Sequence, residues 1–321
     1  MARRLMHAIQ GGGPTGLKHV EVPVPTPKND EILIKVEATS LNPVDWKMQK
    51  VMLRPSIPGT DVAGEIVDVG PGVKKFEVGD TVVAVLTRLF LSTGGGLAEF
   101  AVAKESLTAS RPPEISAAKV AGLPVAGLAA HHCLTQLAGI KLDGNIQQKN
   151  ILITAASGGV GHYAVQLAKL GNAHVTATCG ARNIELVKSL GADEVLDYKT
   201  PDGAALKSPS GKKYDAVIHC ATGISWSTFE PNLSANGKVI DISPSLGSIL
   251  TYALKKLTFS KKQMALLLLV PKIENLEYLV KLVKEGKLKT VIDSKHPLSK
   301  AEDAWAKCIG GHATGKIIVE P

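Results

Sequence analysis

A glycine-rich turn constrains the fold of this chain more than any other sequence feature. The turn spans Ala155–Gly161 and reads Ala-Ala-Ser-Gly-Gly-Val-Gly. It follows an apolar run, Ile151–Ala155, that is typical of a buried strand, and it opens a segment with helical periodicity, Gly159–Leu170. A strand, a glycine-rich turn and a helix in this order are the context that a dinucleotide-binding fingerprint requires.

The turn fits the fingerprint G-x-G-x-x-G with Ala156 in place of the first glycine. At the second position Gly158 allows the backbone to approach a pyrophosphate, and at the third Gly161 allows the helix to pack closely on the strand. The free N–H groups and the positive dipole end of the helix then face the phosphates. A tight strand–helix turn without a ligand is the alternative, but the surrounding β-α-β pattern favours cofactor binding.

The cofactor preference depends on the end of the second strand. NAD-specific sites carry an acid there, about 20 residues after the glycines, which binds the ribose 2′-hydroxyl. This chain reads Thr178-Cys-Gly-Ala-Arg-Asn183 and has no acid in that segment. Arg182 can pair with a 2′-phosphate bidentately, so the sequence favours NADPH. In the alternative interpretation Arg182 is a solvated side chain in the first turn of the next helix.

From Asn150 onward, apolar strands alternate with helical segments. Continuous apolar strands separated by helices indicate a parallel sheet that is covered on both faces. The expected strands are Ile151–Ala155, His174–Thr178, Glu194–Tyr198, Tyr214–His219 and Lys238–Ile242, and the expected helices are Gly159–Leu170 and Ile184–Leu190. This pattern predicts a doubly wound, Rossmann-type α/β domain.

The first third of the chain has a different pattern. Short apolar runs separated by Pro and Gly predict a compact, barrel-like β domain. These runs are Glu31–Glu37, Val62–Val69, Thr81–Leu86 and Ala98–Val102, and an Ala-rich helical segment, Ser116–Leu137, follows them. After residue 270 we expect two further helices and a last strand that returns to the first domain: Ile273–Glu285, Lys300–Ile309 and Lys316–Glu320.

Composition narrows the class of protein. The length of 321 residues favours two domains, and the 45% apolar fraction excludes a disordered chain. The four cysteines show no C-x-x-C spacing, which argues against a disulfide framework and for a reducing compartment. The longest strongly apolar run, Met264–Val270, is far shorter than the about 20 residues of a membrane-spanning helix. The net charge of +8 suits either an anionic partner or a solvated basic surface.

Metal ligands are missing where a zinc-dependent hydride-transfer enzyme needs them. Residues 1–115 contain no cysteine, and their histidines are His7 and His19. The adjacent pair His131-His132 would point its two rings in different directions from a helix. We therefore expect no metal site, and we assign no catalytic side chain, because hydride transfer is the chemistry of the cofactor itself.

Without zinc, a substrate oxygen needs another partner. The segment Leu41-Asn-Pro-Val-Asp-Trp-Lys47 offers Asn42 as a hydrogen-bond donor and Lys47 as a positive charge. The alternative is a loop with one helical turn, in which Asn42 and Asp45 serve as caps. Considered alone, the segment favours this second interpretation.

Five segments have spacings that occur together in one enzyme family: Ser40–Lys47, Ile57–Gly64, Val78–Asp80, Ala155–Gly161 and Ala313–Lys316. Together they resemble the zinc-free quinone oxidoreductase branch of the medium-chain dehydrogenase/reductase superfamily, especially its plant chloroplast envelope members. The resemblance covers essentially the whole chain. It implies a GroES-like catalytic domain over residues 1–118, completed by 271–321, and a Rossmann NADPH-binding domain over 119–270. Zinc-dependent members carry Gly-His-Glu where this chain has Gly59-Thr60-Asp61, so the zinc-ligand positions are lost.

The resemblance also implies the residues of the site. Lys47 would lie near the nicotinamide or the substrate, and in the main hypothesis Asn42 and Lys47 would position the substrate carbonyl. The residues implied to contact NADPH are Lys47, Gly158, Gly159, Val160, Gly161, Gly180, Ala181, Arg182, Asn183, Tyr198, Ile242, Gly311 and His312. Two departures leave the substrate size and one phosphate contact open. The loops Ala8–Gly13 and Met52–Ile57 are shorter than expected, and many relatives carry Arg at the position of His312.

The main hypothesis is an NADPH-dependent, zinc-independent reductase. Members of this branch reduce quinones or the C=C bond of α,β-unsaturated carbonyls, including lipid-derived enones and ketols. Hydride would go to the β-carbon, and water would protonate the α-carbon. The resemblance further implies a homodimer, and its plant envelope members lie peripherally on the chloroplast inner envelope membrane.

The alternative is a membrane-associated or RNA-binding protein with residual NADPH binding. Leu254–Lys272 carries five lysines and no acid beside Leu266–Val270. This segment fits either peripheral contact with anionic lipid or an edge buried in a dimer. Some relatives bind AU-rich RNA, but basicity alone is weak support, and we expect no nucleic-acid partner.

Overall fold

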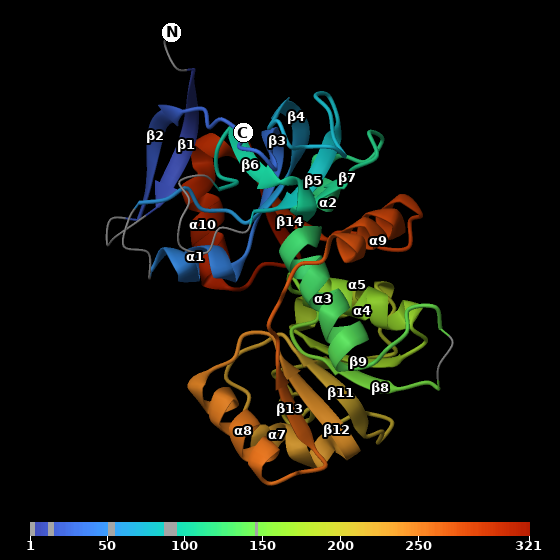
Figure 1. Cartoon of the computed structure of the whole chain (residues 1–321). Helices are drawn as coiled ribbons and strands as arrows, with labels where there is room; N and C mark the ends of the chain where they lie inside the picture. Colours follow the sequence, from blue (N-terminus) through green and yellow to red (C-terminus); the bar gives the residue numbers. More distant parts are fainter. Residues whose placement is uncertain (1–3, 12–15, 51–54, 87–94, 145–146) are drawn as a thin grey trace. The chain divides into compact units, whose positions relative to one another are not determined.

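The structure separates the chain into two compact units. The computed structural model describes residues 4–11, 16–50, 55–86, 95–144 and 147–321. Unit 1 combines Met1–Leu128 with Pro271–Pro321, and unit 2 consists of Ala129–Val270 (Figure 1). The resemblance implies an earlier first boundary, at residue 118. The short helical segments between residues 117 and 127 extend unit 1, because they pack against its sheet and against α9 (Ile273–Lys284).

Unit 2 is a doubly wound α/β domain, as the sequence predicts. Its described residues form a six-stranded parallel sheet in the order β10-β9-β8-β11-β12-β13. The strands are β8 (Asn150–Ile153), β9 (His174–Cys179), β10 (Glu194–Asp197), β11 (Tyr214–His219), β12 (Leu233–Asp241) and β13 (Gln263–Leu266). The central strands β8 and β11 are largely buried, which explains their continuous apolar sequences.

The helices of unit 2 connect successive strands of this sheet. They are α4 (Gly161–Leu170), α5 (Ile184–Ser189), α6 (Pro201–Ala204), α7 (Trp226–Phe229) and α8 (Leu246–Leu257), with 3-10 turns η4 (Ala181–Asn183) and η5 (Glu230–Asn232). Helix α4 is buried along most of its length, as expected of the helix that follows the fingerprint. Helix α8 is amphipathic but has no buried residue. Its apolar face is therefore exposed in a single chain.

Unit 1 is the β-rich domain predicted from the first third of the sequence. In its described part the main sheet has the order β14-β15-β3-β4-β5-β7, and β6 pairs with β3. The strands are β3 (Glu31–Leu41), β4 (Asp61–Val69), β5 (Thr81–Val85), β6 (Phe100–Lys104), β7 (Thr108–Ser110), β14 (Ile292–Pro297) and β15 (Lys316–Glu320). A separate antiparallel pair joins β1 (Leu5–Gly11) and β2 (Leu17–Pro23). The last strand, β15, pairs with β3 near the middle of the main sheet.

Short helices surround this sheet. They are α1 (Pro43–Gln49), α2 (Ala117–Val120), α9 and α10 (Ala301–Gly310), with 3-10 turns η1 (Glu105–Leu107) and η6 (Leu298–Lys300). Helix α10 contacts α1, β14 and β15, and it buries Ala301, Ala304 and Cys308 in one of the hydrophobic clusters of the unit. Because α1 and the end of α10 both carry predicted site residues, this packing bears directly on the site.

The segment Ser116–Leu137 is helical, as predicted, but it is not one regular helix. Two π-helical turns, η2 (Leu123–Gly127) and η3 (Cys133–Leu137), flank the short helix α3 (Leu128–His132). Pro124 lies in the first π turn and has no N–H to donate, which interrupts the regular hydrogen-bond pattern. The division between the two units falls within α3.

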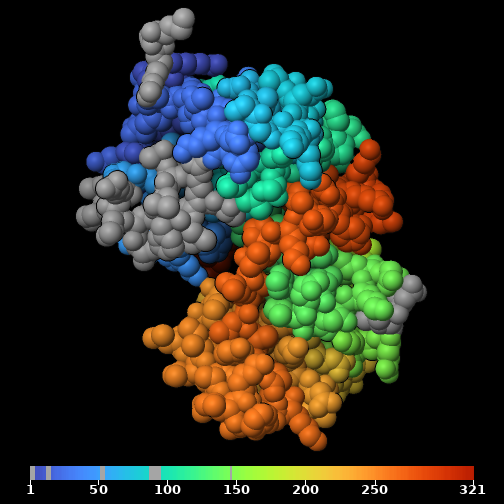
Figure 2. All heavy atoms as spheres, viewed as in Figure 1, coloured from blue at the N-terminus to red at the C-terminus, as the bar shows by residue number. Residues whose placement is uncertain are grey.

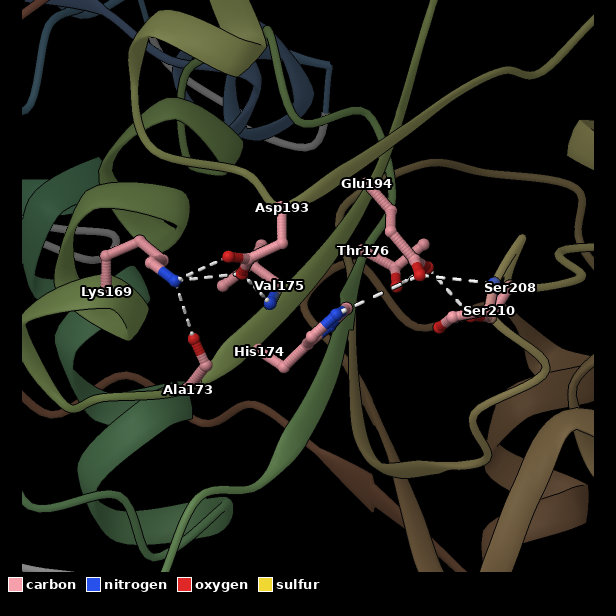
Figure 3. A network of polar contacts seen from close by, with 9 residues as sticks. All are labelled: Lys169, Ala173, His174, Val175, Thr176, Asp193, Glu194, Ser208 and Ser210. Carbon is pink, nitrogen blue, oxygen red and sulfur yellow. Dashed lines mark hydrogen bonds and ion pairs between the residues drawn. The ribbon is translucent and has the colours of Figure 1, made fainter.

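A polar network fastens the amino ends of β9 and β10 (Figure 3). Lys169 Nζ donates to both carboxylate oxygens of Asp193, at 2.9 and 2.8 Å. Glu194 accepts from the hydroxyls of Thr176 and Ser208, at 2.8 and 2.7 Å. Burial opposes ionisation of both acids, but their hydrogen bonds outweigh it, so the pKa of each lies below its ordinary value. This network is at the strand ends opposite to the fingerprint turn and stabilises the sheet there.

Candidate functional site

The fingerprint turn has the geometry that close approach to a phosphate requires. The chain turns through residues 154–160, and α4 begins at Gly161. Ala155 has a φ of +48°, in the left-handed region that alanine rarely adopts. A Cβ on Gly161 would overlap the carbonyl oxygen of Ala155 and lie 2.7 Å from Cα of Ala156. Gly161 therefore allows the helix to start directly against the strand.

The start of α4 provides the donors for an anionic group. The first N–H groups of a helix can bind an anion, and the helix dipole is positive at this end. In this turn the N–H groups of Gly158 and His162 already donate to the carbonyl oxygens of Ala155 and Gly158, at 2.9 and 3.1 Å. A Cβ on Gly158 would lie 3.2 Å from the carbonyl oxygen of Ala155, so a side chain there would crowd the turn. Backbone donors beside a surface without side chains fit the pyrophosphate of a dinucleotide.

The structure brings the predicted residues of unit 2 to one edge of the sheet. Asn183 Nδ2 donates to Ser157 Oγ at 3.0 Å, which joins the segment after β9 to the fingerprint turn. A Cβ on Gly180 would lie 3.5 Å from Cε1 of Tyr198, so the segment after β9 also contacts the residue that follows β10. The carboxyl ends of β8, β9 and β10 thus converge, as a dinucleotide site in this fold requires.

Basic and aromatic groups are exposed at the same edge. Arg182 is exposed, and Tyr198 is 49% exposed. Lys199 was missed by the sequence analysis, although it directly follows Tyr198; its Nζ lies 5.9 Å from the centroid of the Tyr198 ring. No acid occurs in Thr178–Asn183. This edge therefore presents two basic side chains and an aromatic ring.

A second set of side chains fixes the loop that follows β11. The hydroxyl oxygen of Thr154 accepts from the N–H groups of Cys220 and Ala221, at 2.9 and 3.2 Å. Its single proton therefore points to Nδ1 of His219, which lies 3.0 Å away. Burial lowers the pKa of His219, although Asp241 acts in the opposite direction. A neutral His219 thus holds this loop at the carboxyl edge.

Ile242, also predicted to border the cofactor, lies at the same edge. It follows β12 directly, and its N–H donates to the carbonyl oxygen of His219 at 3.3 Å. The carboxyl ends of five neighbouring strands, β10 to β12 in sheet order, therefore carry all of the predicted contacts of unit 2.

Asn42 lies in the interior of unit 1. It is 2% exposed. Its Nδ2 donates to Asp61 Oδ2 at 2.8 Å, and its Oδ1 accepts from Lys316 Nζ at 2.6 Å. Its backbone N–H donates to Asp45 Oδ2 at 2.7 Å, which caps the start of α1. The amide is therefore occupied by protein partners, and this geometry argues against direct substrate contact by Asn42.

The other predicted residues of unit 1 are exposed. Lys47 lies on α1, and its Nζ is 5.8 Å from the centroid of the Trp46 ring. Gly311 ends α10 with a φ of +70°, and His312 follows it. Parts of the two loops predicted to border the substrate, residues 12–13 and 52–54, lie outside the described residues.

Comparison with known proteins establishes the family. Residues 28–113 match the model described as the alcohol dehydrogenase GroES-like domain, and residues 190–319 match the model described as zinc-binding dehydrogenase. The chain is 71% identical, over 100% of both proteins, to the chloroplast envelope quinone oxidoreductase homologue of Arabidopsis thaliana. The chain belongs to the medium-chain dehydrogenase/reductase superfamily. Within it, the chain is an oxidoreductase similar to the quinone oxidoreductases, which confirms the resemblance found from its motifs.

Two further comparisons place this superfamily member among its relatives. It is 33% identical to the chloroplastic NADPH-dependent alkenal/one oxidoreductase of Arabidopsis thaliana, over 93% of the chain and 74% of that protein. The solved quinone oxidoreductase of Coxiella burnetii matches with a TM-score of 0.85 and 31% identity, over 99% of the chain and 100% of that structure. The expected fold class, a GroES-like domain with a Rossmann domain, is thereby confirmed.

The positions of the zinc ligands in this superfamily carry other chemistry here. Thr60 Oγ1 donates to Asp45 Oδ1 at 2.9 Å, and Asp61 Oδ1 accepts from the N–H of Val125 at 3.1 Å. Within the described ranges, no group of three or more His, Cys, Asp or Glu side chains could hold a metal ion. Thr60 and Asp61 are instead joined to neighbouring elements by hydrogen bonds.

Proposed function

We propose that this protein is an NADPH-dependent, zinc-independent reductase of α,β-unsaturated carbonyls or quinones. The observation that carries the proposal is the carboxyl edge of the unit 2 sheet. There, a turn that has no room for a side chain at Gly161 and little at Gly158 lies beside the exposed basic groups Arg182 and Lys199. The names of the relatives support both substrate classes, since one is a quinone oxidoreductase homologue and another an alkenal/one oxidoreductase.

The cofactor contacts are proposed residue by residue. The turn would bind the pyrophosphate through Gly158, Gly159, Val160 and Gly161. The 2′-phosphate and adenosine would contact Gly180, Ala181, Arg182, Asn183 and Tyr198, and we add Lys199 to this group. Ile242, Lys47, Gly311 and His312 would complete the contacts. Arg182 and Lys199 favour a 2′-phosphate over a free hydroxyl, because each pairs its positive charge with a negative charge that the ribose of NADH lacks.

The chain itself orients the substrate and stabilises charge. Bound NADPH supplies the hydride. In the proposed site Lys47 Nζ donates a hydrogen bond to the substrate carbonyl oxygen and stabilises the negative charge that develops there. For an enone, the hydride would go to the β-carbon, and we propose that water supplies the proton to the α-carbon. Asn42 contributes indirectly, by fixing the start of the helix that carries Lys47.

We further infer that two copies associate through α8 and β13. Strand β13 is an edge strand of the sheet, and α8 packs beside it. Large apolar side chains are exposed along this face: Leu246, Ile249, Leu250, Leu254, Leu257, Phe259, Leu268 and Val270. In the space-filling view, α8 and the segment after it, in orange, lie at the surface of unit 2 (Figure 2). A second copy would satisfy the unpaired strand edge as well as the apolar face.

A lipid surface fits this face less well. It cannot pair with the backbone groups of an edge strand. Two of the lysines noted in the sequence are also engaged within the chain. Lys255 Nζ pairs with Glu230 Oε1 at 3.0 Å, and Lys262 Nζ donates to the carbonyl oxygen of Glu230 at 2.6 Å. In the described part of the chain, no helix is long and apolar enough to cross a bilayer. Neither the fold nor the relatives support the RNA-binding alternative.

The names of the relatives also support a location. Since relatives at 65–71% identity are named as chloroplast proteins, we place this protein in the chloroplast, with peripheral attachment to the inner envelope as the finer proposal. Fractionation of plastids would test it: recovery in the envelope fraction, with release by salt, is expected. Recovery in the stroma alone would contradict the attachment, and absence from plastids would contradict the location.

The direct test of the proposed function is a substrate panel. Oxidation of NADPH and of NADH is followed by absorbance with quinones, short enals, long-chain enones and saturated ketones. We expect turnover of enones or quinones, with NADPH much preferred over NADH, and no turnover of saturated ketones. If enones are reduced and quinones are not, the substrate is the conjugated double bond. If quinones are reduced and enones are not, the substrate is the quinone. Inactivity across the panel, with NADPH still bound, would contradict the proposal.

A further inference from the structure

A buried polar network occupies the interior of unit 1. Lys316, the first residue of β15, is 2% exposed, and Asp61, the first residue of β4, is 0% exposed. Lys316 Nζ donates to the carbonyl oxygen of Leu41 at 3.1 Å and to Asn42 Oδ1 at 2.6 Å, and it lies 3.9 Å from Asp61 Oδ2. A buried ion pair is costly to desolvate and is weak evidence for stability. Stability alone therefore does not explain this ion pair, and the segments that it positions become the relevant feature.

Asn42 links this ion pair to α1. Its side-chain amide joins the ammonium of Lys316 to the carboxylate of Asp61, and its backbone N–H binds Asp45. Asp45 Oδ1 in turn accepts from the hydroxyl of Thr60. We call Asn42, Asp45, Asp61 and Lys316 the Lys316 network. A helix of only seven residues is not stable in isolation, so the position of α1 depends on these contacts and on its packing against α10.

Lys316 is connected to both segments of unit 1 that are assigned to the proposed site, to one by hydrogen bonds and to the other along the chain. One is α1, which carries Lys47. The other is the turn after α10, where Gly311 and His312 precede Lys316 by a few residues. The carbonyl oxygen and amide that Lys316 binds belong to the end of β3, immediately before α1. The ammonium of Lys316 therefore ties the start of β15, which follows the second segment, to the residues just before α1.

We propose that the Lys316 network positions α1 and the Gly311–Thr314 segment for hydride transfer, so that Lys316 and Asp61 are positioning residues of the reaction. This proposal rests on the proposed function, because Lys47, Gly311 and His312 are assigned to the site there. Neither Lys316 nor Asp61 touches the substrate. Both act through the backbone and side chain of Asn42.

The charges of the Lys316 network should affect how activity depends on pH. Burial raises the pKa of Asp61 to about 7 and that of Asp45 to about 6, and the charge of Lys316 acts to lower both. Burial lowers the pKa of Lys316 itself. Cys308 on α10 acts on the pKa of Lys316 as well, in the opposite direction to burial. Removing the ammonium should raise the pKa of Asp61 further. The pH at which activity is lost on the acidic side should then rise as well.

The test uses the whole protein and three variants. Lys316→Met removes the ammonium but keeps most of the apolar side chain. The double variant Asp61→Asn/Lys316→Met removes both members of the ion pair. One positive and one negative charge are lost together, so the net charge of the network remains that of Asp45, as in the parent protein. Lys295→Met is the matched control, because Lys295 pairs with Glu320 in the same sheet but is 50% exposed. For each we measure kcat, KM, NADPH affinity, the pH profile and the melting temperature.

We expect kcat of Lys316→Met to fall by about 100-fold, the loss associated with a displacement of about 1 Å. NADPH affinity, which depends mainly on unit 2, should change far less, and the acidic limb should move up by about one pH unit. The double variant should recover the melting temperature but not kcat, and Lys295→Met should match the parent.

Two results would overturn the proposal. The first is an unchanged kcat and pH profile in Lys316→Met. The second is recovery of both the melting temperature and kcat in the double variant, which would make the network purely structural. If Lys316→Met does not fold, the double variant alone decides. A parent protein that does not oxidise NADPH with any substrate would instead refute the proposed function.

Discussion

The carboxyl edge of unit 2 and the interior of unit 1 were both predicted to contact ligands, yet they use their polar groups differently. At the edge of unit 2, Arg182, Tyr198 and the start of α4 present their groups outward. In unit 1, Asn42 directs every group of its amide to protein partners. A polar residue in a family motif can therefore bind either the ligand or other parts of the protein. Burial with all hydrogen bonds made to protein partners identifies the second case.

The largest effect is expected from closing the fingerprint turn. In Gly161→Val the added side chain would overlap the backbone of Ala155 and Ala156. NADPH binding, measured by calorimetry, should fall below detection. Gly247→Ala is the matched control in the same unit, since a Cβ there meets nothing closer than Ser245 Oγ at 3.6 Å. Normal NADPH binding by Gly161→Val would show that the turn is not the cofactor site.

A second large effect concerns assembly. Burial of a leucine contributes about 1.5–3 kcal/mol, so replacing Leu250 and Leu254 with glutamate should weaken a dimer at least about 100-fold. Sedimentation should show monomers, whereas Leu5→Glu, at another exposed leucine, should remain dimeric. If the parent protein is already monomeric and pellets instead with anionic vesicles in low salt, the face binds lipid and not a second copy.

A moderate effect should come from the phosphate-binding side chain. Arg182→Ala removes a charge-assisted hydrogen bond worth about 1.5–3 kcal/mol, so kcat/KM for NADPH should fall by about 10- to 100-fold, with little change for NADH. Lys188→Ala, which removes an exposed lysine of α5 paired with Glu185, is the control. Equal losses with both cofactors would remove Arg182 from the 2′-phosphate site.

The smallest effect contrasts the carboxylates of the two units. The lowered pKa of Glu194 means that its ionised form stabilises the fold above its unfolded pKa, near 4.5, and that this contribution is lost as the pH falls. Glu194→Gln should therefore lower stability by about 1 kcal/mol near neutral pH and by less in acid. The raised pKa of Asp61 has the opposite sign, since its contribution is present in acid and lost as the pH rises through about 7. Denaturant unfolding of Glu194→Gln and Asp61→Asn across this range would show whether the two trends oppose each other.

Local patterns explain why so much of unit 2 could be predicted. The fingerprint turn, its strand and its helix are contiguous in sequence, and the buried strands are continuously apolar. The end of the second strand, with Arg182, follows the turn at a fixed interval. Lys199 was missed because no motif marks it, although its position after Tyr198 at the end of the third strand could have suggested it.

Long-range contacts explain why the interior of unit 1 could not be predicted. Asn42 meets Asp61 across 19 residues and Lys316 across 274 residues. No spacing rule links such positions, so the sequence offered only the choice between a substrate contact and a helix cap. The cap was the interpretation that the segment favoured when considered alone, and Asp45 indeed accepts from the N–H of Asn42. The contacts of Lys316 with Leu41 and Asn42 depend on the pairing of β15 with β3, which no local pattern predicts.

The most direct test of the account is steady-state reduction of an enone or quinone by protein that has been dialysed against a strong chelator and analysed for metal. Metal-free protein is expected to keep its full kcat/KM with NADPH, NADH is expected to support far less turnover, and added zinc is expected to change nothing. Loss of activity on chelation, with recovery on adding zinc, would contradict the central claim that this protein moves hydride without a metal.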